Sequence, residues 1–499
     1  MTTNIVVWHR NDLRVRDNAA LAVAAAEGTA HPVFVFDPHF YRSEVVCDGR
    51  IEFLHESLDQ LAAEYNGLGG TLAFRHGSAE DVLDELLDDA DCLYFNAAPS
   101  AGYARERDER IAAREDVRTF GDDAIVRDGD SRSNWQKQAE AYFTADPHDP
   151  PDTVGSNVDS TATISDIEAE YDIDSTKERT IRGGCRRGRE RLETFVGNID
   201  EYIGGISPPA AARERTSRLS PYLKFGCLSL REVYQHADDE GMHNRAVEMF
   251  HSRLFWNQHF RQKLQDNPTA TEHAVNPVFR GMNRDRHDSD LARAWKRGQT
   301  GFPMIDASMR ALRETGWLNF RMRAMCASFY SYILRCWWKP GADWYYRHLI
   351  DAEPGINYQQ WQMQSGLVGV HPLRIYNPRK QVRENDPDGE FIREFVPELA
   401  DLPADFLPRP EKTPLSVQQE CGVRIGEDYP LPVVDFERRR REARETWAGL
   451  DDRAKEALTD PAIRRRASLS QRRDRSASDV EDGTEPTAEQ QTDLSSFGE

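Results

Sequence analysis

The first part of the chain alternates short apolar runs with amphipathic stretches, and this pattern limits the fold more than any other feature. Between residues 4 and 127, runs of strand length rich in β-branched and aromatic residues are separated by stretches with a helical apolar period. The expected strands are NIVVW, HPVFVFD, TLAFRHG, DCLYFNA and VRTFGDDAIV, and the expected helices are GRIEFLHESLDQLAAEYNGLG and SAEDVLDELLDDA. Strands that alternate with helices form a parallel, doubly wound sheet. We therefore assign residues 1–135 to a Rossmann-like α/β domain.

The composition of the rest of the chain divides it into three further regions. Residues 146–178 are rich in Pro, Asp, Ser and Thr and poor in aliphatic residues, so we expect a surface linker over residues 136–190. Residues 191–440 have helical spacing and many aromatic residues, which predicts an all-α domain. Charge runs follow, and we expect residues 441–499 to form a charged, largely disordered tail.

Composition excludes several classes of protein. The net charge is −21 with a pI near 5.2, as in a protein from a salt-adapted organism or in an ordinary acidic enzyme. Seven cysteines contain no C-x-x-C pair, so neither a zinc site nor an iron–sulfur cluster is indicated. No signal peptide and no membrane-spanning run is present, and we expect a cytoplasmic monomer. Neither a G-x-G-x-x-G motif nor a P-loop motif supports a nicotinamide or nucleoside triphosphate site.

Two stretches carry residues suited to a bound cofactor. TSRLSPYLKFG, from Thr216 to Gly226, places hydroxyls and Arg218 before a helix-forming segment, which suits either a pyrophosphate or a capped helix without a ligand. IDAEPGINYQQWQMQSG, from Ile350 to Gly366, shows neither helix nor strand periodicity, and we expect an irregular loop with polar groups at fixed points. Asp351 in this stretch is the expected partner of Arg323, either as a structural ion pair or beside a cofactor.

Five motifs together resemble the DNA photolyase/cryptochrome family. They are VVWHRNDLRVRDNAAL, TSRLSPYLKFGCLS, AWKRGQTGFPMIDASMRALRETGWLNFRMRAM, HLIDAEPGINYQQWQ and RIYNPRKQVRENDPDGEFIREFVPEL. The resemblance runs in order from the first strand to about Leu407. It implies an α/β domain that holds an antenna pigment, a deazaflavin or a pterin/folate, and a helical domain that holds FAD.

The resemblance also implies roles for individual residues. Asn357 is expected to face flavin N5, Trp256 to stack on a lesion, and Trp361 and Trp338 to pass electrons; an aspartate, Asp285, stands at the third position of that chain. The remaining expected cofactor contacts are Tyr202, Thr216, Ser217, Arg218, Leu219, Ser220, Asn257, Trp317, Phe320, Arg323, Asp351 and Glu353. Trp337, Trp344 and Tyr345 are candidates to replace the missing third aromatic residue.

Several positions depart from the pattern of the dimer photolyases. The resemblance puts Arg253 where they have Glu, Asn257 where they have Arg, Phe320 where they have Asn, Ala324 where they have Met, and Met363 where they have a second stacking Trp. Two functions therefore follow from the sequence. The first is a photolyase that repairs pyrimidine dimers in damaged DNA, with the basic segment PRKQVR meeting phosphates. The second is a cryptochrome-like blue-light photoreceptor with a signalling partner.

Overall fold

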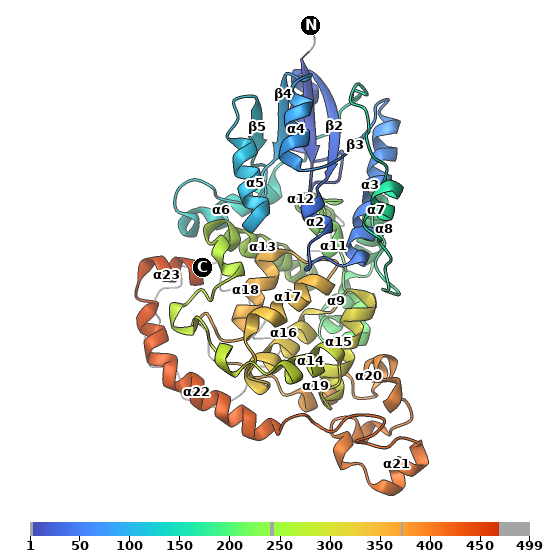
Figure 1. Ribbon diagram of the computed structural model, residues 1–499, viewed down its shortest axis with the longest axis vertical. Helices are drawn as coiled ribbons and strands as arrows, with labels where there is room; N and C mark the ends of the chain where they lie inside the picture. The colour runs from blue at the N-terminus through green and yellow to red at the C-terminus, as the bar shows by residue number, and fades with distance from the viewer. Residues whose placement is uncertain (1–2, 240–243, 371–372, 469–499) are drawn as a thin grey trace.

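A five-stranded parallel sheet forms the centre of the first domain in the computed structural model, which describes residues 3–239, 244–370 and 373–468 (Figure 1). The strand order is β3-β2-β1-β4-β5, with crossovers on both sides of β1. The strands are β1 (Asn4–His9), β2 (Thr29–Phe36), β3 (Ala73–His76), β4 (Cys92–Asn96) and β5 (Val117–Phe120). All five correspond to the expected runs, and the predicted α/β fold class is confirmed.

Helices cover both faces of this sheet. Val6, Trp8 and Val33 point to the face covered by α4 (Ala79–Leu87) and α5 (Gly102–Ala112). Ile5 and Val7 point to the opposite face, which is covered by α1 (Ala19–Glu27) and α3 (Asp48–Gly67). Since successive strand residues face opposite sides, strands buried on both faces read as continuous apolar runs.

The helical domain lies below the sheet in Figure 1. Its helices are α9 (Tyr202–Gly205), α10 (Pro209–Arg215), α11 (Ser220–Lys224), α12 (Leu230–Asp239), α13 (Arg245–Asp266), α14 (Ser289–Arg297), α15 (Pro303–Thr315), α16 (Phe320–Ser328), α17 (Trp338–His348), α18 (Pro354–Gln364), α19 (Pro378–Asn385), α20 (Glu390–Phe395) and α21 (Leu415–Cys421). A π-helical turn, Phe329–Ile333, follows α16. No helix in the described ranges is long and apolar enough to cross a membrane.

The segment expected to be a surface linker is more ordered than its composition indicates. Helix α7 (Ile164–Glu170) lies within it, and α6 (Ser131–Thr144) and α8 (Cys185–Val196) overlap its two ends. The four-residue helix α2 (Pro38–Tyr41) belongs to the α/β domain. The backbone N–H of Gly155 donates to the carbonyl of Ala30, and that of Thr161 donates to the carbonyl of Phe74. These bonds attach the segment to the α/β domain despite its few aliphatic residues.

The prediction of an irregular loop over residues 350–366 is wrong. Pro354 begins the helix α18, which continues to Gln364. Polar side chains such as Asn357, Gln359 and Gln362 are buried on it along with Tyr358 and Trp361. A helix buried on most sides has no amphipathic period, which is why the pattern did not reveal it.

The prediction of a disordered tail is wrong for residues 441–467. They belong to the long helix α22 (Phe436–Ala457) and to α23 (Pro461–Ala467), and α22 runs along the outside of the helical domain (Figure 1). A narrow apolar stripe of Phe436, Ala443, Trp447 and Ala454 is buried against that domain. In the sequence these four apolar residues are widely spaced among charged residues, so the apolar face of the helix is not apparent. Residues 469–499, the rest of the predicted tail, lie outside the described residues.

Trp447→Phe is expected to lower the free energy of unfolding. The Trp447 Nε1–H donates to the carbonyl of Gly366 at 3.2 Å, and the ring packs edge-on against Tyr332. Loss of the indole N–H leaves the partly buried carbonyl of Gly366 without this partner, at a cost of up to about 1–3 kcal/mol. Chemical denaturation measures the change. Leu415→Ala, at a side chain that is 76% exposed, serves as the control and should leave stability unchanged; equal effects of the two variants would contradict the docking of α22.

Candidate functional site

An ion pair in the helical domain joins α16, the start of α11 and the turn between α17 and α18. Arg323 on α16 donates through Nη2 to both carboxylate oxygens of Asp351, at 3.1 and 2.8 Å. The Ser220 hydroxyl at the start of α11 donates to Asp351 Oδ2 at 2.6 Å. Asp351 is only 9% exposed, and Arg323 Nε donates to the carbonyl of Leu318. The pairing of Arg323 with Asp351 suggested by the sequence is therefore present.

A second ion pair also joins α11 to the turn before α18. Lys224, at the end of α11, donates to Glu353 Oε2 at 3.1 Å, and both side chains are largely buried. The other carboxylate oxygen, Glu353 Oε1, is buried without a hydrogen-bond partner. The sequence interpretation missed Lys224, although its spacing of four residues from Ser220 places both on one face of a helix.

The run from Thr216 to Ser220 precedes a helix, as expected, but its hydroxyls are partly used within the protein. Thr216 Oγ1 donates to the carbonyl of Ala212 at 2.5 Å, while Ser217 Oγ accepts from the backbone of Leu219 at 3.5 Å. Leu219 is buried. Together with the bond from Ser220 to Asp351, these contacts show that the helix start is stabilised even without a ligand.

Arg218 in this run has an unusual environment. Its guanidinium lies over the Trp317 ring at 5.0 Å, its Nε is buried without an acceptor, and its backbone φ is +49°. Within the described part of the chain no carboxylate pairs with it. Burial, together with the charges of Arg191 and Arg213, lowers the pKa of Arg218 to about 10. A buried cation with an unsatisfied donor fits an anionic group such as a diphosphate.

Asn357 lies in the first turns of α18. Its Nδ2 donates to the carbonyl of Ala342 on α17 at 3.0 Å, and the residue is 6% exposed. With its amide nitrogen engaged, the side chain presents its carbonyl oxygen as an acceptor.

The two tryptophans expected to pass electrons have different neighbours. Trp361 contacts the rings of Trp295, Tyr330 and Tyr345, and its Nε1 is buried without an acceptor. Trp338, at the first position of α17, packs edge-on against Tyr358. Asp285 is exposed in the short turn Arg284–Arg286.

The residues expected to face a lesion are more accessible. Phe320 is 43% exposed, and Trp256 on α13 is partly exposed, with Phe260 and Arg253 against its ring. Met363 is partly buried beside Val368 and Ala467, and Asn257 accepts from the side chain of Gln258.

Tyr202 and Arg379, two further residues singled out in the sequence, contact mainly other side chains of the protein. Tyr202 packs against Phe195 and Phe250, and its pKa is raised by burial, although Arg253 opposes the shift. In the basic segment PRKQVR, Arg379 pairs with Glu411 at 2.8 Å and lies over Phe302. The guanidinium of Arg379 is thus committed to the protein rather than presented to phosphates.

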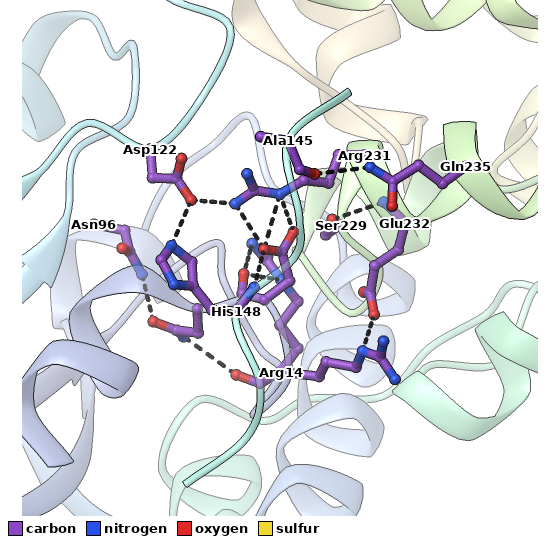
Figure 2. Close-up of polar contacts among 12 residues, drawn as sticks. Arg14, Asn96, Asp122, Ala145, His148, Ser229, Arg231, Glu232 and Gln235 are labelled. Carbon is purple, nitrogen blue, oxygen red and sulfur yellow. Dashed lines mark hydrogen bonds and ion pairs between the residues drawn. The ribbon is translucent and has the colours of Figure 1, made fainter. Parts of the chain in front are cut away.

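A cluster of charged residues, with Asp17 and Arg231 buried and Asp122 and His148 more exposed, joins the two domains where β1, β4 and β5 end (Figure 2). Arg231 on α12 donates through Nε to both oxygens of Asp17 at 2.9 Å, and through Nη2 to Asp122. His148 donates its backbone N–H to Asp17 at 3.1 Å, and its ring bonds Asp122 at 3.0 Å. Burial alone would raise the pKa of Asp17, but the bonds from Arg231 and the charge of Arg14 lower it.

This cluster leaves a cavity of about 80 Å³ at the strand ends, lined by Arg10, Asp12, Asn96, Tyr142 and Arg261 among others. Pockets for cofactors and drug-sized ligands have volumes of about 300–1,000 Å³. A pigment of deazaflavin or pterin size does not fit this cavity with the side chains as they stand.

Comparison with known proteins agrees with this arrangement. The model for the FAD-binding domain of DNA photolyase matches residues 250–449, and the DNA photolyase model matches residues 5–145. A cryptochrome DASH from Natronomonas pharaonis is 31% identical over 469 residues, which cover 87% of this chain and 98% of the relative. A deoxyribodipyrimidine photo-lyase from Halobacterium salinarum is 30% identical, with 87% and 97% covered. The chain belongs to the DNA photolyase/cryptochrome family.

Solved structures of this family have the same fold. A bacterial class III photolyase from Agrobacterium tumefaciens has a TM-score of 0.78 at 28% identity and covers 91% of this chain and 98% of its own. An archaeal photolyase from Sulfolobus tokodaii, described with two FAD molecules and a novel light-harvesting cofactor, has a TM-score of 0.76 at 26% identity, with 90% and 100% covered.

The helical domain of this photolyase-family protein is accordingly an FAD-binding domain. Its residues fit the cofactor on structural grounds. Arg218 Nε, Glu353 Oε1 and Trp361 Nε1 are among the buried polar atoms that have no hydrogen-bond partner within the described chain, so a bound group can satisfy them. Arg218 supplies a donor for phosphate, and Glu353 and Asn357 supply acceptors for hydroxyl or N–H groups.

Proposed function

We propose that this flavoprotein is a light-driven photolyase that splits pyrimidine dimers in damaged DNA by electron transfer from reduced FAD. The observation that best supports the proposal is the environment of Asn357. Its Nδ2 is held by the Ala342 carbonyl, so that Oδ1 is left as an acceptor. An acceptor suits a flavin N5 that carries a proton, as it does in the reduced form used for repair.

The binding roles within this proposal follow from the site. Arg218 and the run of Thr216, Ser217, Leu219 and Ser220 hold the diphosphate, with Tyr202 and Trp317 as supporting contacts. Arg323 and Asp351 lie beside the flavin, where charge and hydrogen bonding set its electronic properties. When bound, FAD supplies light absorption and one-electron chemistry. The protein's own residues bind it, orient it and exclude water.

The lesion in this proposal meets Trp256, Asn257, Phe320 and Met363. A flipped-out dimer is poorly stacked in DNA, so its extrusion costs less than that of a normal base. Residues 1–135 and 191–440 are the two functional domains that we propose.

A cryptochrome-like photoreceptor is the second candidate. It is favoured by the departures at the lesion-facing positions, where Arg253 contacts Trp256 and Met363 takes the place of a stacking tryptophan. Under this alternative, light changes the flavin redox state and a partner protein reads the change.

Repair under blue light separates the two candidates. Ultraviolet-irradiated DNA is incubated with chemically reduced protein at high salt, in light and in darkness, and the remaining dimers are counted. A photolyase removes dimers only in the light. If the count stays unchanged in both arms while FAD is bound and reduced, the photolyase proposal is wrong.

Trp256→Ala is expected to weaken binding of damaged DNA in the dark. Stacking of a base on an aromatic side chain contributes about 1–3 kcal/mol. Electrophoretic mobility shifts with irradiated and intact duplexes measure the effect. Trp337→Ala is the control, since Trp337 is also partly exposed but lies under Arg284 in another part of the domain. Equal losses with both variants would contradict a role for Trp256 at the lesion.

We also include an antenna pigment, a deazaflavin or a pterin, in the proposed function. Because the cavity at the strand ends is small, the pigment requires either movement of the interdomain charge cluster or a different surface. The absorption spectrum of the purified protein identifies the pigment.

A further inference from the structure

A small cavity on the outside of the helical domain is surrounded by arginines. It has a volume of about 170 Å³ and lies where α22 passes the turn before α14 and the end of the π-helical turn. Pockets for drug-sized ligands are larger, at about 300–1,000 Å³, so this cavity has room for a small ion and a few waters. None of the residues assigned above to the flavin or the lesion lines it. Its lining consists of three arginines, one aspartate and two leucines, namely Arg286, Arg335, Arg439, Asp288, Leu291 and Leu334.

The arginines of this cavity have few acceptors. Arg335 Nη1 and Arg439 Nη1 both donate to the same oxygen, Glu442 Oε2, at 3.1 and 3.3 Å. The Nε of each of these two arginines is buried without an acceptor in the described part of the chain. Arg286 lies in an exposed turn, and its side chain has no ion pair with any described residue. Three guanidinium groups thus share two carboxylates, those of Glu442 and Asp288, and a net positive charge remains.

Arg335 has a backbone conformation that is costly for an arginine. It follows Leu334, the residue that ends the π-helical turn, and its φ is +57°. Glycine is the usual residue in this left-handed conformation after a helix end. Strain of this kind persists only where the surrounding structure holds it, and it is concentrated at functional sites. Glu442 and, at 3.3 Å, Thr446 hold the Arg335 side chain at the cavity. A glycine at this position would relieve the strain but remove a cation from the lining.

Asp288 supplies a negative charge to the lining, but its carboxylate also caps a helix. Its Oδ1 accepts the backbone N–H groups of Asp290 and Leu291, at 2.8 and 3.1 Å, at the start of α14. Asparagine caps a helix about as well as aspartate does. The charge of Asp288 is therefore not required for the cap, and it opposes the binding of an anion in the cavity.

The arrangement of the donors selects among anions. The three arginines come from separate segments: the turn Arg284–Arg286, the residue after the π-helical turn, and α22. A carboxylate presents two oxygens in one plane, whereas a tetrahedral oxyanion presents four oxygens and can accept hydrogen bonds from several sides. Guanidinium groups bind such oxyanions through charge-assisted and often paired hydrogen bonds. Arginines on three sides of a small cavity therefore match a phosphate or a sulfate.

We propose that this cavity binds a free tetrahedral oxyanion, inorganic phosphate or sulfate, which connects α22 to the turns at Arg286 and Arg335. The anion supplies shared acceptors and offsets the repulsion among the guanidinium groups, so it stabilises the docking of the outer helix. A phosphate of a nucleic-acid backbone has the same chemistry. The free ion is favoured because the cavity is small and the Arg335 side chain is only 13% exposed, whereas a backbone phosphate is flanked by sugars that require an open groove.

Isothermal titration calorimetry of the FAD-loaded full chain with inorganic phosphate, at constant ionic strength, tests the proposal. The wild type should bind one phosphate per chain, and sulfate should compete. Arg286→Ala should weaken the affinity by about tenfold or more, because it removes a charge-assisted hydrogen bond. Asp288→Asn should strengthen it, because a like charge is removed while the cap is kept. Arg297→Ala is the matched control: Arg297 is also exposed but lies at the other end of α14, and the affinity should not change.

Hydrogen–deuterium exchange locates the bound ion. Phosphate should slow backbone exchange in α22 around Glu442 in the wild type and not in Arg286→Ala. Absence of saturable binding by the wild type would overturn the proposal. Equal losses of affinity in Arg286→Ala and Arg297→Ala would do the same, because they would indicate general screening of surface charge.

Titration with an intact DNA duplex distinguishes the two sources of a phosphate group. If binding of the duplex, and not of free phosphate, depended on Arg286, the cavity would be a nucleic-acid contact and the proposal would be wrong. These measurements need neither light nor a lesion. Their failure would therefore leave the photolyase proposal unaffected, and failure of dimer repair would leave the oxyanion site unaffected.

Discussion

Asp351→Ala is expected to yield a protein that is purified without FAD. The carboxylate accepts two bonds from Arg323 and one from Ser220, and its removal leaves the Arg323 charge largely buried without a partner. Breaking such a pair by removing one member costs about 3–5 kcal/mol. If that cost falls on the bound state, affinity for FAD drops by about two to four orders of magnitude. The ratio of flavin to protein absorbance and a titration with FAD measure the loss.

The control for this variant is Glu411→Ala. Glu411 forms a comparably buried pair with Arg379 at 2.8 Å, but its contacts lie with α19 and away from Asp351. It should lower stability while leaving FAD content unchanged. Asp351→Asn, which keeps the shape and loses the charge, should retain part of the flavin. A fully flavin-loaded Asp351→Ala protein would show that the Arg323–Asp351 pair is structural only.

Local sequence patterns predicted the secondary-structure elements that are specified within a single segment, and the residue types predicted one ion pair. The five strands were found because strands buried on both faces read as apolar runs, and the Arg323–Asp351 pair because a buried arginine requires an acid. Helix α18 was missed because its buried face includes Asn357, Gln359 and Gln362. Helix α22 was missed because four apolar residues were hidden among charges. In both cases tertiary packing, and not local periodicity, decides the structure.

Apart from the Arg323–Asp351 pair, contacts between distant segments could not be predicted from the sequence. The Tyr358–Asp343 bond joins two helices that begin sixteen residues apart (338 and 354), and nothing in either helix marks the pair. The interdomain cluster is a stronger case, since Asp17, His148 and Arg231 come from three separate parts of the chain. Residue types indicated which groups need partners but not which partners they find.

Asp17→Asn is expected to destabilise the protein near neutral pH and to have little effect at low pH. Asp17 is buried with φ near +52°, a conformation that asparagine adopts readily, so the substitution changes charge and adds no backbone strain. Loss of the carboxylate leaves Arg231 with a weaker partner, at a cost of about 3–5 kcal/mol for a buried pair. Denaturant unfolding at neutral pH measures this difference.

The sign of the pH dependence follows from the lowered pKa of Asp17. A carboxyl group whose pKa is lower in the folded protein stabilises the fold above its unfolded pKa of about 3.9. That contribution disappears as the pH falls from this value through the folded pKa, where both states become protonated. The difference in unfolding free energy between wild type and Asp17→Asn should therefore narrow on acidification below about pH 4.

Asp172→Asn provides the matched control, since Asp172 has a similar φ of +51° but is exposed. Its stability should equal that of the wild type at every pH. If Asp17→Asn were as stable as Asp172→Asn near neutral pH, the Arg231 cluster would contribute nothing net to holding the two domains together. A gap that stayed constant down to low pH would instead assign the effect to packing, because packing does not titrate.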